Sequence, residues 1–175
     1  MKKVLLRILL VLVVLIALAG VIAYTDGNSL PVDHSVSVTG TVPAPPQKVF
    51  SLITDVAHGA SWRHSVKSVK VLPPDAGRDH WIEDLGHGQT MTFLATHTEF
   101  LTRRDVLLTV PGAAYGGTWT YELSPGATPD ETTLKITETG FIHPPLYRFA
   151  MAHIFGPTHS LDQYMTDIET AATKP

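Results

Sequence analysis

The feature that most restricts the fold of this chain is a run of six strand patterns between residues 66 and 139. Clusters of proline, glycine and aspartate separate the patterns. Connections this short cannot hold the crossover helix that parallel strands need, so the sequence predicts an antiparallel meander. The six predicted strands are Val66–Leu72, His80–Leu85, Thr90–Phe100, Asp105–Val110, Thr118–Leu123 and Thr133–Thr139.

Other periodic segments flank this run. Residues 34–42 alternate as a seventh strand, and the prolines at 43–46 begin a short helix with an apolar stripe. A second short helix is predicted around residues 58–64. The segment Leu146–Met165 keeps one apolar face across Gly156 and Pro157. We therefore expect one long C-terminal helix with a kink near His153, because proline removes one backbone hydrogen bond.

The N-terminus holds an apolar block. No charged residue occurs from Ile8 to Tyr24, and Lys2, Lys3 and Arg7 precede the block. Residues 4–24 would form a helix about 30 Å long, the thickness of the hydrocarbon layer of a bilayer. The positive flank predicts a cytoplasmic N-terminus and a single-pass anchor in the cell membrane over residues 1–24, with the rest extracytoplasmic.

Two alternatives concern the same region. Small residues at Ala17 and Ala19 fit a signal peptide that is cleaved to release a secreted protein, but the apolar run continues to Ala23 and favours a retained anchor. Residues 25–33 are rich in turn formers and predict a short tether. Residues 34–172 are then the folded domain.

Composition excludes several kinds of function. The chain without residues 1–24 has 10 basic and 16 acidic residues, a net charge of −6, so it lacks the positive charge that nucleic-acid binding needs. Cysteine is absent from the sequence, and so are the H-E-x-x-H, G-x-S-x-G and P-loop motifs. The sequence predicts no metal, no cofactor and no nucleic-acid partner.

Four segments resemble a known superfamily. They are PPQKVFSLITDVAHGASW, GGTWTYELSP, TTLKITETG and the C-terminal LYRFAMAHIFG with LDQYM, and the likeness spans His34–Ala172. The chain resembles a bacterial membrane-anchored subgroup of the START-like (SRPBCC) superfamily of polyketide cyclases, dehydrases and lipid-transfer proteins. The resemblance implies an α+β helix-grip fold: a curved seven-stranded antiparallel sheet, two short helices after the first strand and a long C-terminal helix over the sheet. These motifs identify the fold better than the activity.

A cavity between sheet and helix would be lined by inward-facing aromatic residues. Alternation in GTWTYEL puts Trp119 and Tyr121 on the inner face, although such residues are also usual in a plain core. The candidate ligand-binding residues are Trp81, Trp119, Tyr121, Phe149, His153 and Tyr164.

Three residues are candidates for acid or base chemistry. Glu83 and Glu138 follow apolar residues on the predicted inner faces, where an unpaired carboxylate is costly. They form an acid/base pair if both point into one pocket; otherwise at least one of them meets solvent. His153 interrupts the apolar stripe of the C-terminal helix and is the third candidate. The orientations of His97 and Glu99 stay open.

Three functional hypotheses follow. The first is a membrane-anchored domain that binds a small hydrophobic or amphipathic, lipid-like ligand. The second is an enzyme of cyclase or dehydratase type that uses Glu83, Glu138 and His153. The third is a structural or partner-binding module with a closed core. The sequence leaves open whether the protein is an enzyme.

Overall fold

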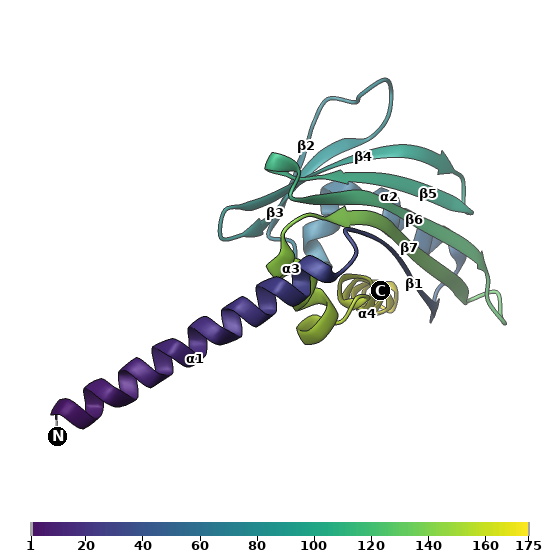
Figure 1. Cartoon of the computed structure of the whole chain (residues 1–175). Coiled ribbons are helices and arrows are strands. Elements are labelled where there is room, and N and C mark those ends of the chain that lie inside the picture. Colours follow the sequence, from purple (N-terminus) through teal and green to yellow (C-terminus); the bar gives the residue numbers. More distant parts are fainter. Residues whose placement is uncertain (1, 175) are drawn as a thin grey trace. The chain divides into compact units, whose positions relative to one another are not determined.

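The computed structural model describes residues 2–174, shown in Figure 1. The chain divides into two compact units. The sheet unit comprises residues 33–141 and the segment from 158 onward. The anchor unit comprises the chain up to residue 32 together with residues 142–157. The C-terminal region predicted as one helix is therefore shared between the two units.

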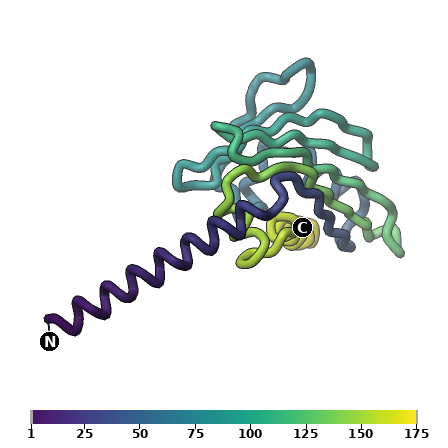
Figure 2. The backbone as a smooth tube through the Cα atoms, in the orientation of Figure 1, coloured from purple at the N-terminus to yellow at the C-terminus, as the bar shows by residue number. Residues whose placement is uncertain are grey.

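The sheet unit is built on seven strands in the order β1-β7-β6-β5-β4-β3-β2. Figure 2 follows the chain through the successive hairpins from β2 to β7, and the first strand pairs antiparallel with the last. All seven predicted strands are confirmed, with small shifts at their ends. Their bounds are β1 Asp33–Val42, β2 Ser68–Val71, β3 His80–Gly86, β4 Gln89–Glu99, β5 Arg103–Thr109, β6 Tyr115–Pro125 and β7 Thr132–Ile142.

Helices α2 (Pro46–Thr54) and α4 (His159–Ala172) pack on the inner face of the sheet. Period-2 alternation buries every second strand residue against them, as at Leu134 and Ile136. The predicted stripe of α2 is buried too, and a 3₁₀ helix, η1 (Val56–Ser61), forms the second short helix. This arrangement is the predicted α+β helix-grip architecture.

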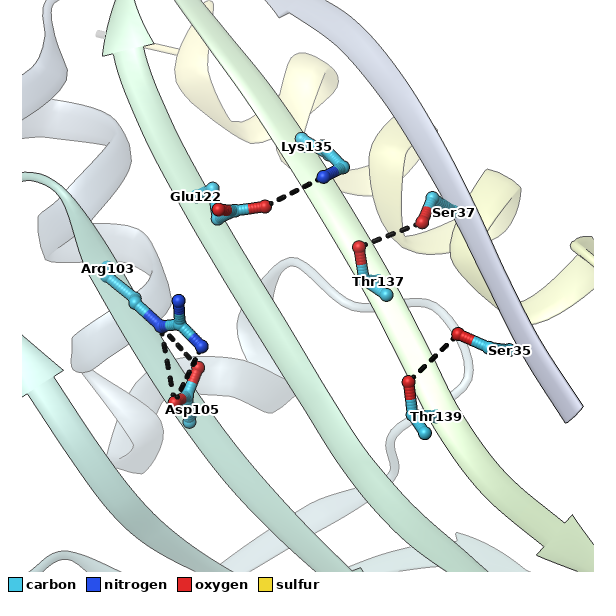
Figure 3. A network of polar contacts seen from close by, with 8 residues as sticks. All are labelled: Ser35, Ser37, Arg103, Asp105, Glu122, Lys135, Thr137 and Thr139. Atoms are coloured by element: carbon cyan, nitrogen blue, oxygen red, sulfur yellow. Dashed lines mark hydrogen bonds and ion pairs between the residues drawn. The ribbon is translucent and has the colours of Figure 1, made fainter. Parts of the chain in front are cut away.

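The outer face of the sheet is polar, and Figure 3 views it with the helices behind the strands. Short polar side chains and opposite charges pair across or along neighbouring strands. These contacts include Ser37–Thr137 at 2.8 Å, Ser35–Thr139 at 3.0 Å, Lys135–Glu122 at 3.0 Å and Arg103–Asp105 at 3.0 Å. The Ser35–Thr139 and Ser37–Thr137 contacts on this face are exposed to water.

The C-terminal region corrects the prediction of one kinked helix. Helix α3 (Pro145–Ala150) continues as a π-helical turn, η3 (Met151–Phe155), and then stops. Gly156 has φ 93° and ψ 147°, a conformation that glycine adopts readily and that no helix contains. Pro157 reinforces the break, because the residue before proline is driven out of the helical region. Helix α4 begins anew at His159, so an irregularity does occur at His153, but the helix is not continuous.

Helix α1 (Lys2–Ser29) is the first element of the anchor unit. It is long and apolar enough to cross a membrane, with a mean hydropathy of 3.1 over 18 residues. It extends into the segment predicted as a tether, which leaves only residues 30–32 between α1 and β1. Two contacts explain the extension: Thr25 donates a side-chain hydrogen bond to Val21, and Arg148 donates from Nε to the Gly27 carbonyl at 2.8 Å.

Candidate functional site

The interior of the sheet unit contains charged and hydroxyl groups among its apolar side chains. Five residues, which we call the inner polar cluster, come from five parts of the chain. Arg63 follows η1, Glu83 lies on β3, Arg104 on β5, Tyr121 on β6 and Tyr164 on α4. The buried members share one core with the apolar residues of the sheet and of α2.

Glu83 is 2% exposed and pairs with Arg63. Arg63 Nη1 donates to Glu83 Oε1 at 2.5 Å, and Trp81 Nε1 donates to the same oxygen at 3.0 Å. A buried carboxylate needs such partners, because the loss of hydration costs several kcal/mol per ion, roughly. The other oxygen, Oε2, is buried and has no hydrogen-bond partner within residues 2–174. Glu83 is thus only half satisfied.

Arg104 is 1% exposed, and its guanidinium is also only partly hydrogen-bonded. Its Nη2 donates to Asp79 Oδ2 at 2.8 Å, and its guanidinium lies 5.8 Å from the centre of the Trp81 ring. Its Nε is buried and unpaired among the described residues. Trp81 therefore contacts both half-satisfied groups, one through its indole N–H and the other through its ring.

Two tyrosines complete the cluster. The rings of Tyr121 and Tyr164 lie 5.3 Å apart, and the Arg63 guanidinium lies 5.2 Å from the centre of the Tyr164 ring. Burial raises the pKa of Tyr164 to about 12 against the lowering effect of Arg63, and burial also raises the pKa of Tyr121 well above its usual range. Both hydroxyls are therefore neutral hydrogen-bond donors at physiological pH.

The position of Arg63 follows from a neighbouring contact. Asp167 on α4 is buried and accepts hydrogen bonds from the backbone N–H of His64, at 3.0 Å, and from His64 Nδ1. These bonds tie the loop after η1 to α4. Burial is the largest single influence and acts to lower the pKa of Arg63, but Glu83, Tyr164 and Tyr121 together outweigh it, so the pKa is raised and the guanidinium stays charged. The ion pair is thereby held between loop and sheet.

Four predicted ligand-binding residues lie in this part of the sheet unit. Trp81 stacks on Phe93 with ring centres 5.3 Å apart, and Trp119 packs edge-on against Tyr164 at 5.8 Å. Tyr121 lies beside both Trp119 and Tyr164. The aromatic side chains predicted to face inward from the sheet and from α4 do share one interior.

The other two, Phe149 and His153, belong to the anchor unit. Their rings lie 4.9 Å apart, and His153 Nε2 is 2.8 Å from Asp26 Oδ2 near the end of α1. These two residues belong to a different unit from the other four because the helix breaks at Gly156. The apolar stripe that looked continuous in the sequence belongs to two separate helices. His153 is half-exposed and makes a polar contact with Asp26, instead of interrupting a buried face.

Glu83 and Glu138 do not meet as an acid/base pair. Both lie on the inner side, but strands β4, β5 and β6 separate β3 from β7, which is four spacings of about 4.8 Å. Glu138 has partners of its own: its Oε1 lies 3.5 Å from His34 Nε2, and Ser160 Oγ donates to its Oε2 at 3.4 Å. His97, whose orientation was open, is exposed beyond a β-bulge in β4.

Sequence reasoning missed both arginines of the cluster. Arg104 alternates with the outward Arg103 and shares the inner face with Val106, so strict alternation along β5 could have identified it. Arg63 lies in a loop without periodicity, and no pattern in the sequence pairs it with Glu83.

A separate open hollow of about 520 Å³ lies where β1 begins and β7 ends. Gly117 and Gly140 contribute no side chains to it, and Phe141 forms part of its apolar wall. The full lining is Asp33, His34, Ser35, Gly117, Thr139, Gly140 and Phe141. It adjoins the His34–Glu138 contact and not the inner polar cluster.

Comparisons with known proteins agree with this fold. The sequence profile of the family described as polyketide cyclase/dehydrase and lipid transport matches residues 33–158. The chain is similar in structure to the Zhui aromatase/cyclase from Streptomyces sp. R1128, with a TM-score of 0.64 and 14% identity over 80% of this chain and 93% of the other. No curated protein matches the sequence significantly.

Two further structures show the same likeness. A START superfamily protein from Mycobacterium smegmatis has a TM-score of 0.61 and 16% identity, over 79% of this chain and 97% of that one. Truncated norcoclaurine synthase from Thalictrum flavum has a TM-score of 0.61 and 10% identity, over 84% and 99%. At such identities the likeness extends to the fold and not to the chemistry.

Proposed function

We propose that this chain, which belongs to the polyketide cyclase/dehydrase and lipid transport family, is a membrane-anchored protein that binds a small hydrophobic or amphipathic ligand between its sheet and α4. The observation that carries the proposal is a pair of buried polar atoms, Glu83 Oε2 and Arg104 Nε, which have no hydrogen-bond partner within residues 2–174 and lie beside Trp81. Native interiors leave few such atoms, and a ligand is one way to satisfy them.

The chemistry of the cluster favours a ligand with an apolar body and one polar group. The body would replace contacts among the aromatic side chains around Tyr164. A hydroxyl would donate to Glu83 Oε2, or a carbonyl would accept from Arg104 Nε. Satisfying one buried polar atom is worth about 1–3 kcal/mol, enough to select such a ligand over a pure hydrocarbon.

Helix α1 supports the anchoring part of the proposal. Lys2, Lys3 and Arg7 precede its apolar run, so the N-terminus would stay in the cytoplasm and the sheet unit would face the other side. Cleavage after Ala19 would instead release the domain. N-terminal sequencing of the protein from the membrane fraction distinguishes these outcomes.

Intrinsic fluorescence tests ligand binding directly, because the three tryptophans of the chain are Trp62, Trp81 and Trp119, and all lie in or beside the cluster. The full chain in nanodiscs is titrated with a fatty alcohol, a methyl ester and an alkane of equal chain length. We expect a saturable spectral shift with the first two probes and a weaker one with the alkane.

Two variants sharpen the titration. Glu83→Gln should weaken binding of the alcohol, while Glu122→Gln, on the outer face, should leave it unchanged. Equal shifts for all three probes would remove the polar cluster from the binding site. No shift with any probe would favour the closed-core module instead.

A second candidate function is cyclase or dehydratase chemistry at the same cluster. It is favoured by the two neutral tyrosine hydroxyls, which hydrogen-bond to each other so that Tyr164 can donate to a carbonyl oxygen as negative charge develops on it, beside a carboxylate that can accept a proton. The full chain is incubated with a short poly-β-ketone thioester, and loss of water is followed by mass spectrometry. Turnover that Glu83→Gln abolishes without loss of binding would establish the reaction, whereas binding without turnover would exclude it for this substrate.

A further inference from the structure

The anchor unit carries several large apolar side chains that are exposed over half or more of their surface. Leu146 and Tyr147 lie on α3, and Ile154 and Phe155 lie on the π-helical turn η3. Each is at least half-exposed, and Ile154 is 66% exposed. Four such side chains within ten residues are more than the scattered apolar residues of an ordinary surface.

This segment is fixed to the end of helix α1. Arg148 is buried and donates from Nε to the Gly27 carbonyl at 2.8 Å and from Nη1 to the Ile142 carbonyl at 2.9 Å. Gly27 is one of the last four residues of α1, whose carbonyls lack partners within the helix and carry its negative dipole end. The Arg148 guanidinium therefore supplies a hydrogen-bond donor to one of these carbonyls and a positive charge at the negative end of the helix dipole.

Two more contacts tighten the junction. A Cβ on Gly27 would come within 2.0 Å of the Pro145 carbonyl oxygen, so only glycine permits this approach of α3. His153 Nε2 lies 2.8 Å from Asp26 Oδ2 and ties η3 to the same end of α1. The segment 142–157 is thus bound to α1 at both of its helical pieces.

The place of this junction along α1 sets its depth relative to a membrane. The apolar run of α1 ends at Tyr24, and Gly27 follows three residues later, about 4.5 Å further along the helix axis. The polar layer on each side of a hydrocarbon core is about 5–7 Å thick. If α1 spans the bilayer, the contacts of α3 and η3 with the end of α1 lie inside this headgroup layer.

We infer that the exposed face of α3 and η3, formed by Leu146, Tyr147, Ile154 and Phe155, inserts into the lipid interface beside the anchor. This inference rests on the proposed anchoring role of α1 and adds a second, interfacial contact with the same bilayer. The composition fits: Tyr24 and Tyr147 are half-exposed aromatic residues of the kind that gather at the headgroup level. Apolar side chains on short helical pieces bind a lipid surface in the same manner.

The absence of cysteine from the chain allows a direct depth measurement. Single variants Leu146→Cys and Ile154→Cys carry an environment-sensitive fluorophore, and the full chain is placed in phosphatidylcholine vesicles with or without lipid-borne quenchers. Phe100→Cys is the matched control, because Phe100 is an apolar residue with 74% exposure in the sheet unit. Val14→Cys, in the middle of α1, reports on the anchor itself.

We expect the labels at 146 and 154 to emit at shorter wavelength than the label at 100 and to be quenched several-fold more strongly by shallow, headgroup-level quenchers. The label at 14 should respond to deep quenchers. If the label at 14 is quenched but those at 146 and 154 behave like the control, the interfacial inference fails while the anchor stands. If the label at 14 is not quenched either, the anchoring proposal fails with it.

One further outcome would identify another occupant. Labels at 146 and 154 that are shielded from water yet escape lipid quenching would mean that protein covers this face, and the inference would be overturned. A double variant, Ile154→Asp with Phe155→Asp, supplies the converse test. It should abolish lipid quenching of the label at 146 while the response of the label at 14 persists.

Discussion

Arg103 and Arg104 are consecutive residues of β5, yet they lie in opposite environments. Arg103 faces outward, where its guanidinium makes three hydrogen bonds to Asp105 in the open network of Figure 3. Arg104 faces inward, is almost fully buried and has an Nε without a partner in the described part of the chain. The arginine on the outer face therefore makes three hydrogen bonds where water could also have served it, whereas the buried arginine keeps that unpaired donor where water cannot reach it.

The contrast extends to the two faces as a whole. The outer face contains exposed pairs that contribute little to stability, since water screens the charges and solvates both partners equally well. The inner face contains fewer polar groups, but each carries a large desolvation cost. Polar residues that are costly and incompletely paired are typical of sites kept for binding or chemistry. Paired variants on the two faces test this difference.

The largest effect is expected at Glu83. Glu83→Ala leaves Arg63 without its partner inside the fold and should lower the free energy of unfolding by about 3–5 kcal/mol. Glu122→Ala, which breaks the outer pair with Lys135, should cost no more than about 1 kcal/mol. Urea unfolding of the full chain in one mild detergent measures both. Equal losses of unfolding free energy in the two variants would contradict the proposed energetic difference between inner and outer polar pairs.

The next effect concerns alkaline pH. The folded state holds the pKa of Tyr164 at about 12, and the unfolded chain has its ordinary value of 10.0. Below pH 10 both states are neutral, so this contribution to stability is fully present. As pH rises from 10 towards 12, the unfolded chain alone loses the proton, and stability falls by about 1.4 kcal/mol per pH unit, roughly 3 kcal/mol in all.

Melting temperature as a function of pH, together with tyrosinate absorbance, follows this loss. Tyr164→Phe should make the decline above pH 10 shallower. The exposed Tyr147→Phe should not change it. An identical decline in all three proteins would mean that Tyr164 titrates with its ordinary pKa and that water reaches its hydroxyl group.

A smaller difference is expected between two threonines of β7. Thr132 is fully buried and donates from Oγ1 to the Ala44 carbonyl at 2.7 Å, so Thr132→Val should cost about 1–2 kcal/mol. Thr137 pairs with Ser37 on the exposed face, and Thr137→Val should change stability by less than about 0.5 kcal/mol. Chemical denaturation measures both; a larger loss at Thr137 would contradict the comparison.

The smallest effect is expected at Arg103. Arg103→Ala removes a guanidinium that is 43% exposed and opens the side chain of its partner, Asp105, which is 17% exposed in the pair, to water. We expect an unfolding midpoint unchanged within error and unchanged ligand titration curves. A clear shift in either would show that the outer network supports the interior site.

The sequence predicted the sheet well because most strands alternate with a clear period and sharp turns separate the strands. It also placed Trp81, Trp119, Tyr121 and Tyr164 on the inner side, since alternation and helical spacing fix direction. It failed where local pattern and backbone geometry conflict. The stripe across Gly156 indicated one helix, but the positive φ of that glycine and the following proline end it.

The inner polar cluster shows a second limit of prediction from sequence, which concerns contacts between residues far apart in the chain. Its core is a contact between a loop residue, Arg63, and a strand residue, Glu83, which lie 20 positions apart. No periodicity relates them, because only the folded chain brings the loop against the sheet. The end of α1 was likewise unpredictable, since its last turn depends on Arg148, 121 residues further along the chain.

The pairing of the first strand with the last affects how this protein is made. Ser37 on β1 finds Thr137 on β7 only after 100 further residues have been synthesised. At 5–20 residues per second, β1 waits roughly 5–20 s with its backbone hydrogen bonds unmet on that side. Folding must therefore be largely post-translational for this edge, and its closing step is slow because the two strands are far apart in sequence. During that interval β1 is an unpaired strand, a ready template for pairing with another chain.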